Sequence, residues 1–168
     1  MPALRSPVTI AFAALALAAS AYTASAVGAP TRFNACGLLS ARQLATIHVR
    51  SGGHCSQKSA PFKQYATITT AAWGRLGGGT GYALAAVYAV KAPYVAAAKQ
   101  LLDKGGTSVG VGDWSSFDGL SNGKTGGGIV FGVGHYVVDL TFGTPSSRPL
   151  ASAKPFIALA KLLAAKLK

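Results

Sequence analysis

The alternation of hydrophobic and polar positions along the chain predicts helices and strands that follow one another in a single fold. Ser40 is a favourable helix N-cap and precedes Leu44 at helical spacing, so a short helix is expected to begin at Ala41. Residues 62–73 are rich in Thr, Ile and Tyr, and a glycine-rich break separates them from a second extended stretch at 82–90. This pattern is typical of a β-hairpin.

A second helix and a second hairpin are expected farther along the chain. Pro93 suits the first turn of a helix, and apolar residues recur at helical spacing from there to Gly105. Residues 128–142 alternate between apolar and mixed positions, with Gly132 and Gly134 at the turn. The alternation predicts a hairpin with one packed face.

Two polar or glycine-rich stretches are expected to be loops. Residues 50–61 are rich in Gly and Ser, and residues 106–128 combine many glycines with Ser, Asn and Asp, leaving room for one short strand near Val109. Because long loops often carry binding or catalytic residues, the second stretch is a candidate functional loop. Its candidate residues are Gly110, Gly112, Asp113 and Trp114.

The last element is predicted to be an amphipathic helix that begins at Pro149 or Pro155 and ends near Leu167. Helices therefore come before, between and after the strands, which indicates an α+β domain. We expect an antiparallel sheet of about four to six strands, with helices packed mainly on one face.

Residues 1–26 have the features of an export signal. Arg5 supplies a positive start, residues 8–19 are apolar and uncharged, and Ala24 and Ala26 place small residues where signal peptidase requires them. Cleavage is therefore expected near Ala26. A retained membrane anchor is the alternative, although the apolar stretch is shorter than the roughly 20 residues that span a bilayer.

Export changes the interpretation of the two cysteines, Cys36 and Cys55. In an oxidising compartment outside the cytoplasm, whether the protein is secreted or periplasmic, a pair of cysteines indicates a disulfide. Closing the loop between these two cysteines is expected to stabilise the fold by roughly 3 kcal/mol. The mature chain is then expected to consist of a flexible segment, 27–35, and a single α+β domain, 36–168.

His48 and His54 lie close enough to Cys55 along the chain to suggest a zinc site. Their spacing matches no standard zinc motif, and a cysteine in a disulfide cannot also be a thiolate ligand. We therefore expect neither a metal nor a cofactor.

The charge balance is strongly basic, with 16 Lys and Arg against 4 acidic residues, all aspartates, and a net charge of +12. Such a chain favours acidic partners, here an anionic envelope polymer or a membrane surface. Lys154, Lys161 and Lys168 recur every seven residues along the last helix and are the candidate contacts. The helix either docks on the sheet with these lysines in water or lies in an anionic membrane surface.

A nucleic-acid partner is not expected, because the chain has neither an aromatic RNA-binding motif nor a clustered basic helix. We expect a monomer. The function expected from these features is that of an exported, disulfide-stabilised, non-enzymatic domain that binds at the cell envelope. The alternative is a basic protein that engages a membrane or a polyanion through its C-terminal amphipathic helix.

A second alternative is a small serine hydrolase. Residues 106–110 match the G-x-S-x-G pattern of the nucleophile elbow in α/β-hydrolases, with Ser108 as the nucleophile. Asp113 or Asp118, and then His135, follow in the chain order of a catalytic triad. The elbow requires a strand before the serine and a helix after it, whereas the pattern here predicts a helix before it and a loop after it.

Several short motifs resemble those of bacterial secreted and lipoprotein domains of unknown function. They are Cys36-Gly37-Leu38-Leu39-Ser40 before a capped helix, the second cysteine Cys55, Gly110-Val111-Gly112-Asp113 at the end of a loop, a late hairpin and a closing helix. The resemblance implies an α+β envelope domain and supplies no catalytic residues. The chain departs from this pattern because it has no lipidation cysteine and has Ser56-Gln57 where an aromatic residue is common.

Overall fold

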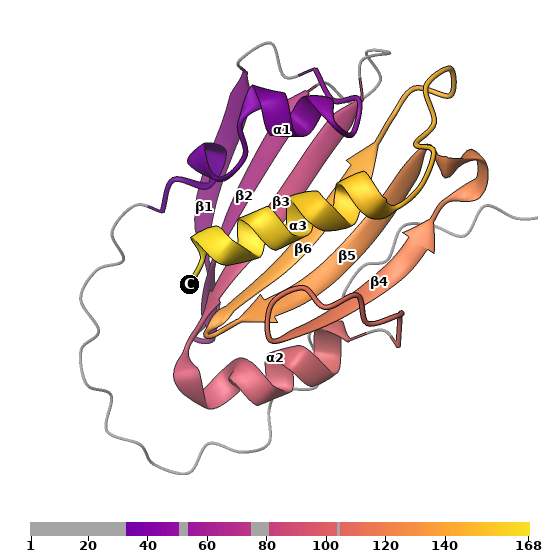
Figure 1. Cartoon of the computed structure of the whole chain (residues 1–168). Coiled ribbons are helices and arrows are strands. Elements are labelled where there is room, and N and C mark those ends of the chain that lie inside the picture. The colour runs from indigo at the N-terminus through magenta and orange to yellow at the C-terminus, as the bar shows by residue number, and fades with distance from the viewer. Residues whose placement is uncertain (1–32, 51–53, 75–80, 104) are drawn as a thin grey trace, which may run out of the picture. The chain divides into compact units, whose positions relative to one another are not determined.

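A computed structural model of the chain describes residues 33–50, 54–74, 81–103 and 105–168, so the expected signal segment lies outside the described residues (Figure 1). With η marking a 3₁₀ helix, the elements in chain order are η1 (Ala35–Leu38), α1 (Ala41–Ala45), β1 (Cys55–Phe62), β2 (Ala66–Gly74), β3 (Tyr82–Val90), η2 (Ala92–Tyr94), α2 (Val95–Leu102), β4 (Trp114–Leu120), η3 (Asn122–Lys124), β5 (Gly126–Val133), β6 (Tyr136–Gly143) and α3 (Lys154–Lys166).

The strands form one six-stranded antiparallel sheet in the order β1-β2-β3-β6-β5-β4. This confirms the predicted α+β class. Both predicted hairpins are present, as β2 with β3 and as β5 with β6. The central pair, β3 and β6, joins two strands that are distant in the sequence.

Ser40 begins α1, as predicted. Its hydroxyl accepts a hydrogen bond from the backbone amide of Gln43 (3.3 Å), and the Gln43 side chain accepts one from the Ser40 amide (2.8 Å). This capping box satisfies two backbone donors that the first helical turn leaves unpaired. It explains why a helix of only five residues forms here.

The two faces of the sheet are covered unequally. One face carries Val87, Phe131 and Leu140, which pack with η1, α1 and α3 in the main core. The opposite face, here called the open face, carries their neighbours Tyr88 and Val130, which pack with α2 in a smaller cluster. Helices therefore lie mainly on one face, as predicted. We call residues 33–50 and 144–168, which contain η1, α1 and α3, the helical layer.

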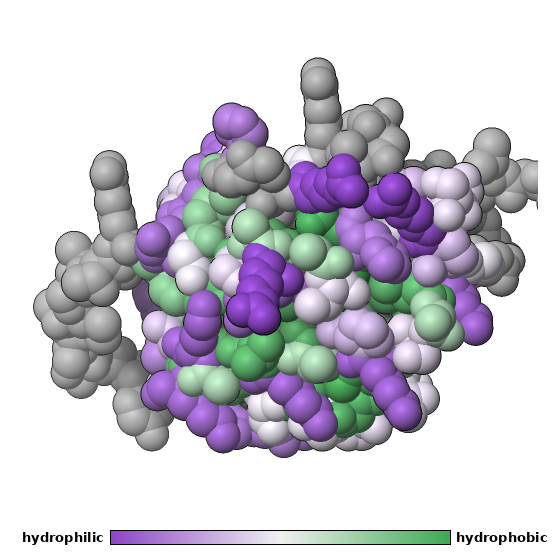
Figure 2. All heavy atoms as spheres, turned by 45° about the horizontal axis from the view of Figure 1, so that its top comes forward, coloured by the Kyte–Doolittle hydropathy of each residue, from purple (hydrophilic) through white to green (hydrophobic). Residues whose placement is uncertain are grey.

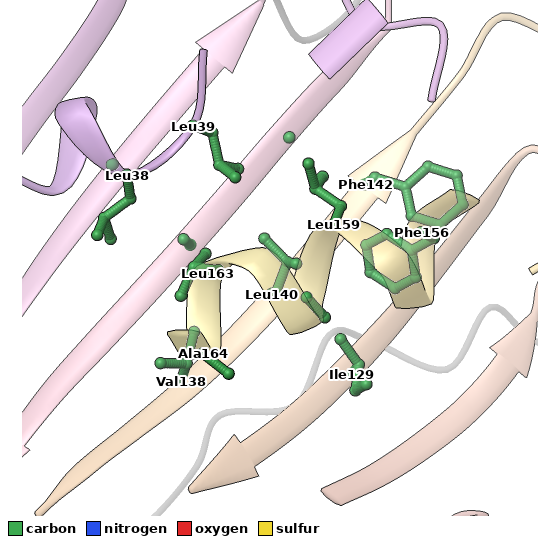
Figure 3. Close-up of a cluster of buried hydrophobic side chains, with 14 of the residues drawn as sticks. Leu38, Leu39, Ile129, Val138, Leu140, Phe142, Phe156, Leu159, Leu163 and Ala164 are labelled. Atoms are coloured by element: carbon green, nitrogen blue, oxygen red, sulfur yellow. The ribbon is translucent and has the colours of Figure 1, made fainter. Parts of the chain in front are cut away.

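α3 supplies much of the main core. Figure 3 shows Phe156, Leu159 and Leu163 lying over the strands, and all three are buried. The rings of Phe156 and Phe142 have centroids 4.4 Å apart. Burial of each such side chain is worth about 2 kcal/mol, so the apolar stripe of α3 accounts for its docking.

The loop predicted for residues 50–61 is wrong for the part that forms β1. β1 lies at the edge of the sheet, and residues 56–61 are exposed on both of its faces. A strand with two exposed faces needs no apolar positions, so its sequence lacks the alternation that usually indicates a strand.

The loop predicted for residues 106–128 is also wrong in part. Trp114–Leu120 forms β4, and β5 begins at Gly126. Gly132, which the sequence placed at a turn, lies inside β5, and the turn is made by Gly134 and His135.

η1 is attached to two other parts of the fold. The Cys36–Cys55 disulfide joins it to β1, with 5.7 Å between the two Cα atoms. The Nζ atom of Lys166 in α3 donates to the carbonyl oxygens of Gly37 (3.3 Å) and Leu38 (2.6 Å). These contacts fix the start of the domain to its first strand and its last helix.

The folded chain begins ahead of the first cysteine. Ala35 is buried, and the ring of Phe33 stacks on Tyr136 with centroids 5.8 Å apart. Residues 33–35, from the segment that the sequence predicts to be flexible, therefore pack on the domain. Among the described residues, no helix combines the length and apolar character needed to cross a bilayer.

Candidate functional site

Ionic side chains are divided unevenly between the two sides of the sheet. Within the helical layer every ionic side chain is a lysine or an arginine. These residues are Arg42, Arg50, Arg148, Lys154, Lys161, Lys166 and Lys168, and all of them are exposed. Figure 2 shows hydrophilic side chains standing between paler and hydrophobic residues on this side of the molecule. The layer has no acidic side chain to offset these seven positive charges, so its surface potential is positive.

The four aspartates lie outside the helical layer. Asp139 and Asp118 are on β6 and β4, Asp103 follows α2, and Asp113 lies beside the β5–β6 turn. Asp139 points to the open face, because its neighbours Val138 and Leu140 belong to the main core. Asp118 lies near the open-face position of Gly128. The folding of the chain thus separates the acids from the basic layer.

The predicted row of lysines follows the exposed side of α3. Seven residues advance an α-helix by about 10.5 Å and leave it about 20° short of two full turns, so Lys154 and Lys161 are nearly in line. Lys168 lies just beyond the last residue of α3. The exposed residues between them include Ala158 and Ala165, whose small side chains leave room for a large ligand to approach the amines.

Two nearby lysines are engaged within the fold. Lys166 binds the carbonyl oxygens of η1, and Nζ of Lys124 donates to the carbonyl oxygen of Ala151 (3.2 Å). Among the described residues, Lys154, Lys161 and Lys168 have no hydrogen-bond or ion-pair partner. Their amines are therefore available to an external anion.

Of the two arrangements that the sequence left open for the last helix, the structure has the docked one. The apolar stripe of α3 lies in the main core, and its lysines face water. Sequence reasoning identified these lysines but missed Arg42, Arg50 and Arg148. The signal that would have identified them is the absence of acidic residues from 33–50 and 144–168.

Of the candidate loop residues, Gly112, Asp113 and Trp114 lie against β5, whereas Gly110 is exposed. The Asp113 amide donates to the Gly132 carbonyl oxygen (2.7 Å), and an Asp113 carboxylate oxygen accepts from the Gly134 amide (2.7 Å). Gly112 has a φ of 64°, and a β-carbon there would lie 2.2 Å from the Gly132 oxygen. The segment therefore needs glycine at this close approach, and its aspartate holds the β5–β6 turn.

Two buried serines attach the chain ahead of β4 to that strand. The Ser116 hydroxyl accepts from the Gly106 amide (2.9 Å), and the Ser115 hydroxyl accepts from the amides of Val109 (3.2 Å) and Val111 (3.4 Å). These bonds satisfy backbone donors that a regular strand would otherwise have paired.

The residues of the hydrolase alternative do not come together. Ser108 is exposed between α2 and β4, so the strand-turn-helix of a nucleophile elbow is not formed around it. Among the described residues, its hydroxyl has no hydrogen bond to an aspartate or a histidine. Asp113 is engaged at the Gly134 amide, and His135 packs against Tyr136, with ring centroids 4.1 Å apart.

The sulfur atoms of Cys36 and Cys55 are bonded to each other, so neither is a thiolate that could join His48 and His54 in a zinc site. In the part of the chain that the structure describes, no three His, Cys, Asp or Glu residues gather in a group that could hold a metal ion.

The open face carries the phenol of Tyr88, whose pKa is shifted. Burial raises the pKa of the Tyr88 phenol above its usual value of 10.0, and the nearby carboxylate of Asp139 raises it further. Both effects disfavour the phenolate, so Tyr88 is neutral at physiological pH.

Comparison with protein-family models, with curated proteins and with solved structures finds no match to this chain.

Proposed function

We propose that this protein is an exported, disulfide-stabilised domain that binds an anionic polymer of the cell envelope through the basic surface of its helical layer. The observation that carries the proposal is the absence of acidic side chains from the helical layer, which has seven lysines and arginines in residues 33–50 and 144–168. Such a surface attracts polyanions, and its affinity for them rises with the number of cationic side chains that contact the polymer.

A polymer fits this surface better than a membrane. Insertion into a bilayer requires an exposed apolar stripe, and the stripe of α3 is buried in the core. A linear polyanion needs only repeated cationic contacts, which Lys154 and Lys161 supply about 10.5 Å apart along the helix. We propose binding rather than catalysis because Ser108, Asp113 and His135 do not form a catalytic triad. Asp113 accepts a hydrogen bond from the Gly134 amide, and His135 packs against Tyr136.

The test measures affinity for a linear polyphosphate as the salt concentration rises. The variant carries Lys154→Gln, Lys161→Gln and Lys168→Gln. The control carries Lys63→Gln, Lys91→Gln and Lys99→Gln, which remove the same charge from exposed residues outside the helical layer. We expect the affinity of the Lys154, Lys161 and Lys168 variant to fall at least about tenfold, which equals about 1.4 kcal/mol of binding free energy. The affinity of the control is expected to change much less. We also expect salt to weaken binding by the unmodified protein.

Equal losses in the two triple variants would overturn the proposal, because net charge alone would then account for binding. Binding to phosphatidylglycerol vesicles without binding to polyphosphate would replace the polymer by a membrane. Export is tested separately. The protein recovered from outside the cytoplasm is expected to begin at Val27 and to contain no free thiol, whereas an intact Met1 would contradict export.

A further inference from the structure

The open face of the sheet contains a groove that the proposed polymer site does not use. It has a volume of about 560 Å³ and lies over β1 and β2. The lining residues are Ser56, Gln57, Lys58, Ala60, Ile68, Thr70 and Ala72. α2 packs at the other end of this face, where Phe62, Ala66 and Tyr88 belong to its cluster. The groove is therefore bounded by an apolar cluster on one side and by solvent at the β1 edge.

The groove combines one cation with an apolar floor. Lys58 and Thr70 are directly paired across β1 and β2, so an ammonium and a hydroxyl stand in one row. The next row toward α2 pairs Ala60 with Ile68, and the register continues from Ile68 to Tyr88 on β3. The polar and apolar parts of the groove are thus adjacent, in rows two residues apart along the strands.

From this juxtaposition we infer that the groove binds a single-chain anionic amphiphile. Its acidic head group contacts Lys58 and Thr70, and its alkyl chain lies over Ala60 and Ile68 toward Tyr88. Among the described residues that line the groove, Lys58 alone is ionic, so the complementary ligand has one anionic centre rather than a row of them. The volume falls within the range of about 300–1,000 Å³ that small-molecule sites occupy.

This site is independent of the proposed polymer site, because the two lie on opposite faces of the sheet. The test uses the full folded domain and dodecyl phosphate below its micelle concentration, with affinity measured by calorimetry. We expect saturable binding that Lys58→Gln weakens about fivefold, as loss of one exposed charge contact predicts. Lys63→Gln removes an exposed cation just beyond the end of β1 and is expected to leave binding unchanged.

A chain-length series tests the apolar half of the site. Octyl and decyl phosphate are expected to bind progressively more weakly than dodecyl phosphate, by up to about fourfold for each methylene that leaves the groove. Thr70→Val keeps the β-branched shape and removes the hydroxyl, so it is expected to weaken the head-group contact without affecting the dependence on chain length.

Several results would overturn the inference. They are no binding of dodecyl phosphate, equal binding of dodecyltrimethylammonium, and a Lys58→Gln variant that binds normally while its circular dichroism is unchanged. The triple variant of Lys154, Lys161 and Lys168 is expected to bind the amphiphile normally, so the polymer and amphiphile sites succeed or fail separately.

Discussion

The indole of Trp114 lies over Gly132, its directly paired neighbour on β5, so closely that a β-carbon on the glycine would stand 2.0 Å from the indole nitrogen. Tyr82 has the same relationship with Gly143 on β6, where a β-carbon would lie 2.4 Å from the ring. In both pairs an aromatic ring covers the backbone that a glycine leaves bare, which compensates for the weak strand propensity of glycine.

Gly132→Ala is expected to lower the free energy of unfolding by about 2 kcal/mol, because the new methyl group must displace the Trp114 ring. Urea denaturation followed by circular dichroism provides the measurement. Gly128→Ala on the same strand is the control, since its β-carbon would meet Thr141 at an ordinary 3.5 Å. Equal destabilisation by the two substitutions would show that the indole contact is not the cause.

Loss of the Cys36–Cys55 disulfide is expected to lower the free energy of unfolding by about 3 kcal/mol, because the reduced, unfolded chain gains conformational freedom. Urea midpoints with and without reductant measure this loss. A protein with both Cys36→Ser and Cys55→Ser should match the reduced protein and show no response to reductant. A reductant effect that persists in the double variant would contradict the explanation.

Lys166→Met is expected to destabilise the domain by about 1 kcal/mol, because it leaves the Gly37 and Leu38 carbonyl oxygens without their donor. Lys161→Met changes an exposed lysine on the same helix and should stay within about 0.5 kcal/mol of the unmodified protein. Thermal unfolding of both variants makes the comparison. Similar melting temperatures would show that the η1 contact contributes little.

The raised pKa of Tyr88 predicts a loss of stability at alkaline pH. The unfolded phenol ionises near its usual pKa of 10.0, whereas burial and the Asp139 carboxylate keep the folded phenol protonated. The stabilisation is therefore complete below about pH 10 and is lost as the pH rises through the folded pKa, with a slope of at most about 1.4 kcal/mol per pH unit.

Tyr88→Phe removes this proton, so the variant should lose less stability than the unmodified protein between about pH 10 and pH 11. Urea denaturation across that range measures the free energy of unfolding of each protein. The lysines titrate in both proteins, so their contribution cancels in the difference between the two. Parallel pH dependences would contradict the assignment to Tyr88.

The parts of the fold that were predictable from sequence are those with one buried and one exposed side. α3 shows this periodicity clearly, and β6 alternates over most of its length. Both lie where the pattern places them, although the β5–β6 turn is made by Gly134 and His135 and does not include Gly132. β1 has no buried face, and β4 buries Ser115 and Ser116, whose burial depends on hydrogen bonds to a segment that sequence alone cannot position. Those two strands were therefore missed.

The candidate site was predictable only where it follows a single helix. The seven-residue spacing identified Lys154, Lys161 and Lys168. Arg148 lies ahead of that helix and outside its spacing, and Arg42 and Arg50 come from the other segment of the layer and join the lysines only through folding. The groove around Lys58 was not predictable, because it is lined by β1, whose sequence lacks the alternation that indicates a strand.

The position of α3 after every strand of the sheet has a consequence for the order of folding. Phe156, Leu159 and Leu163 cover the inner side of strands that all precede them in the chain. A polypeptide that emerges from its N-terminus onward therefore exposes that apolar surface until the residues of α3 are free to fold. Premature termination before residue 154 is expected to leave an aggregation-prone sheet instead of a smaller stable protein.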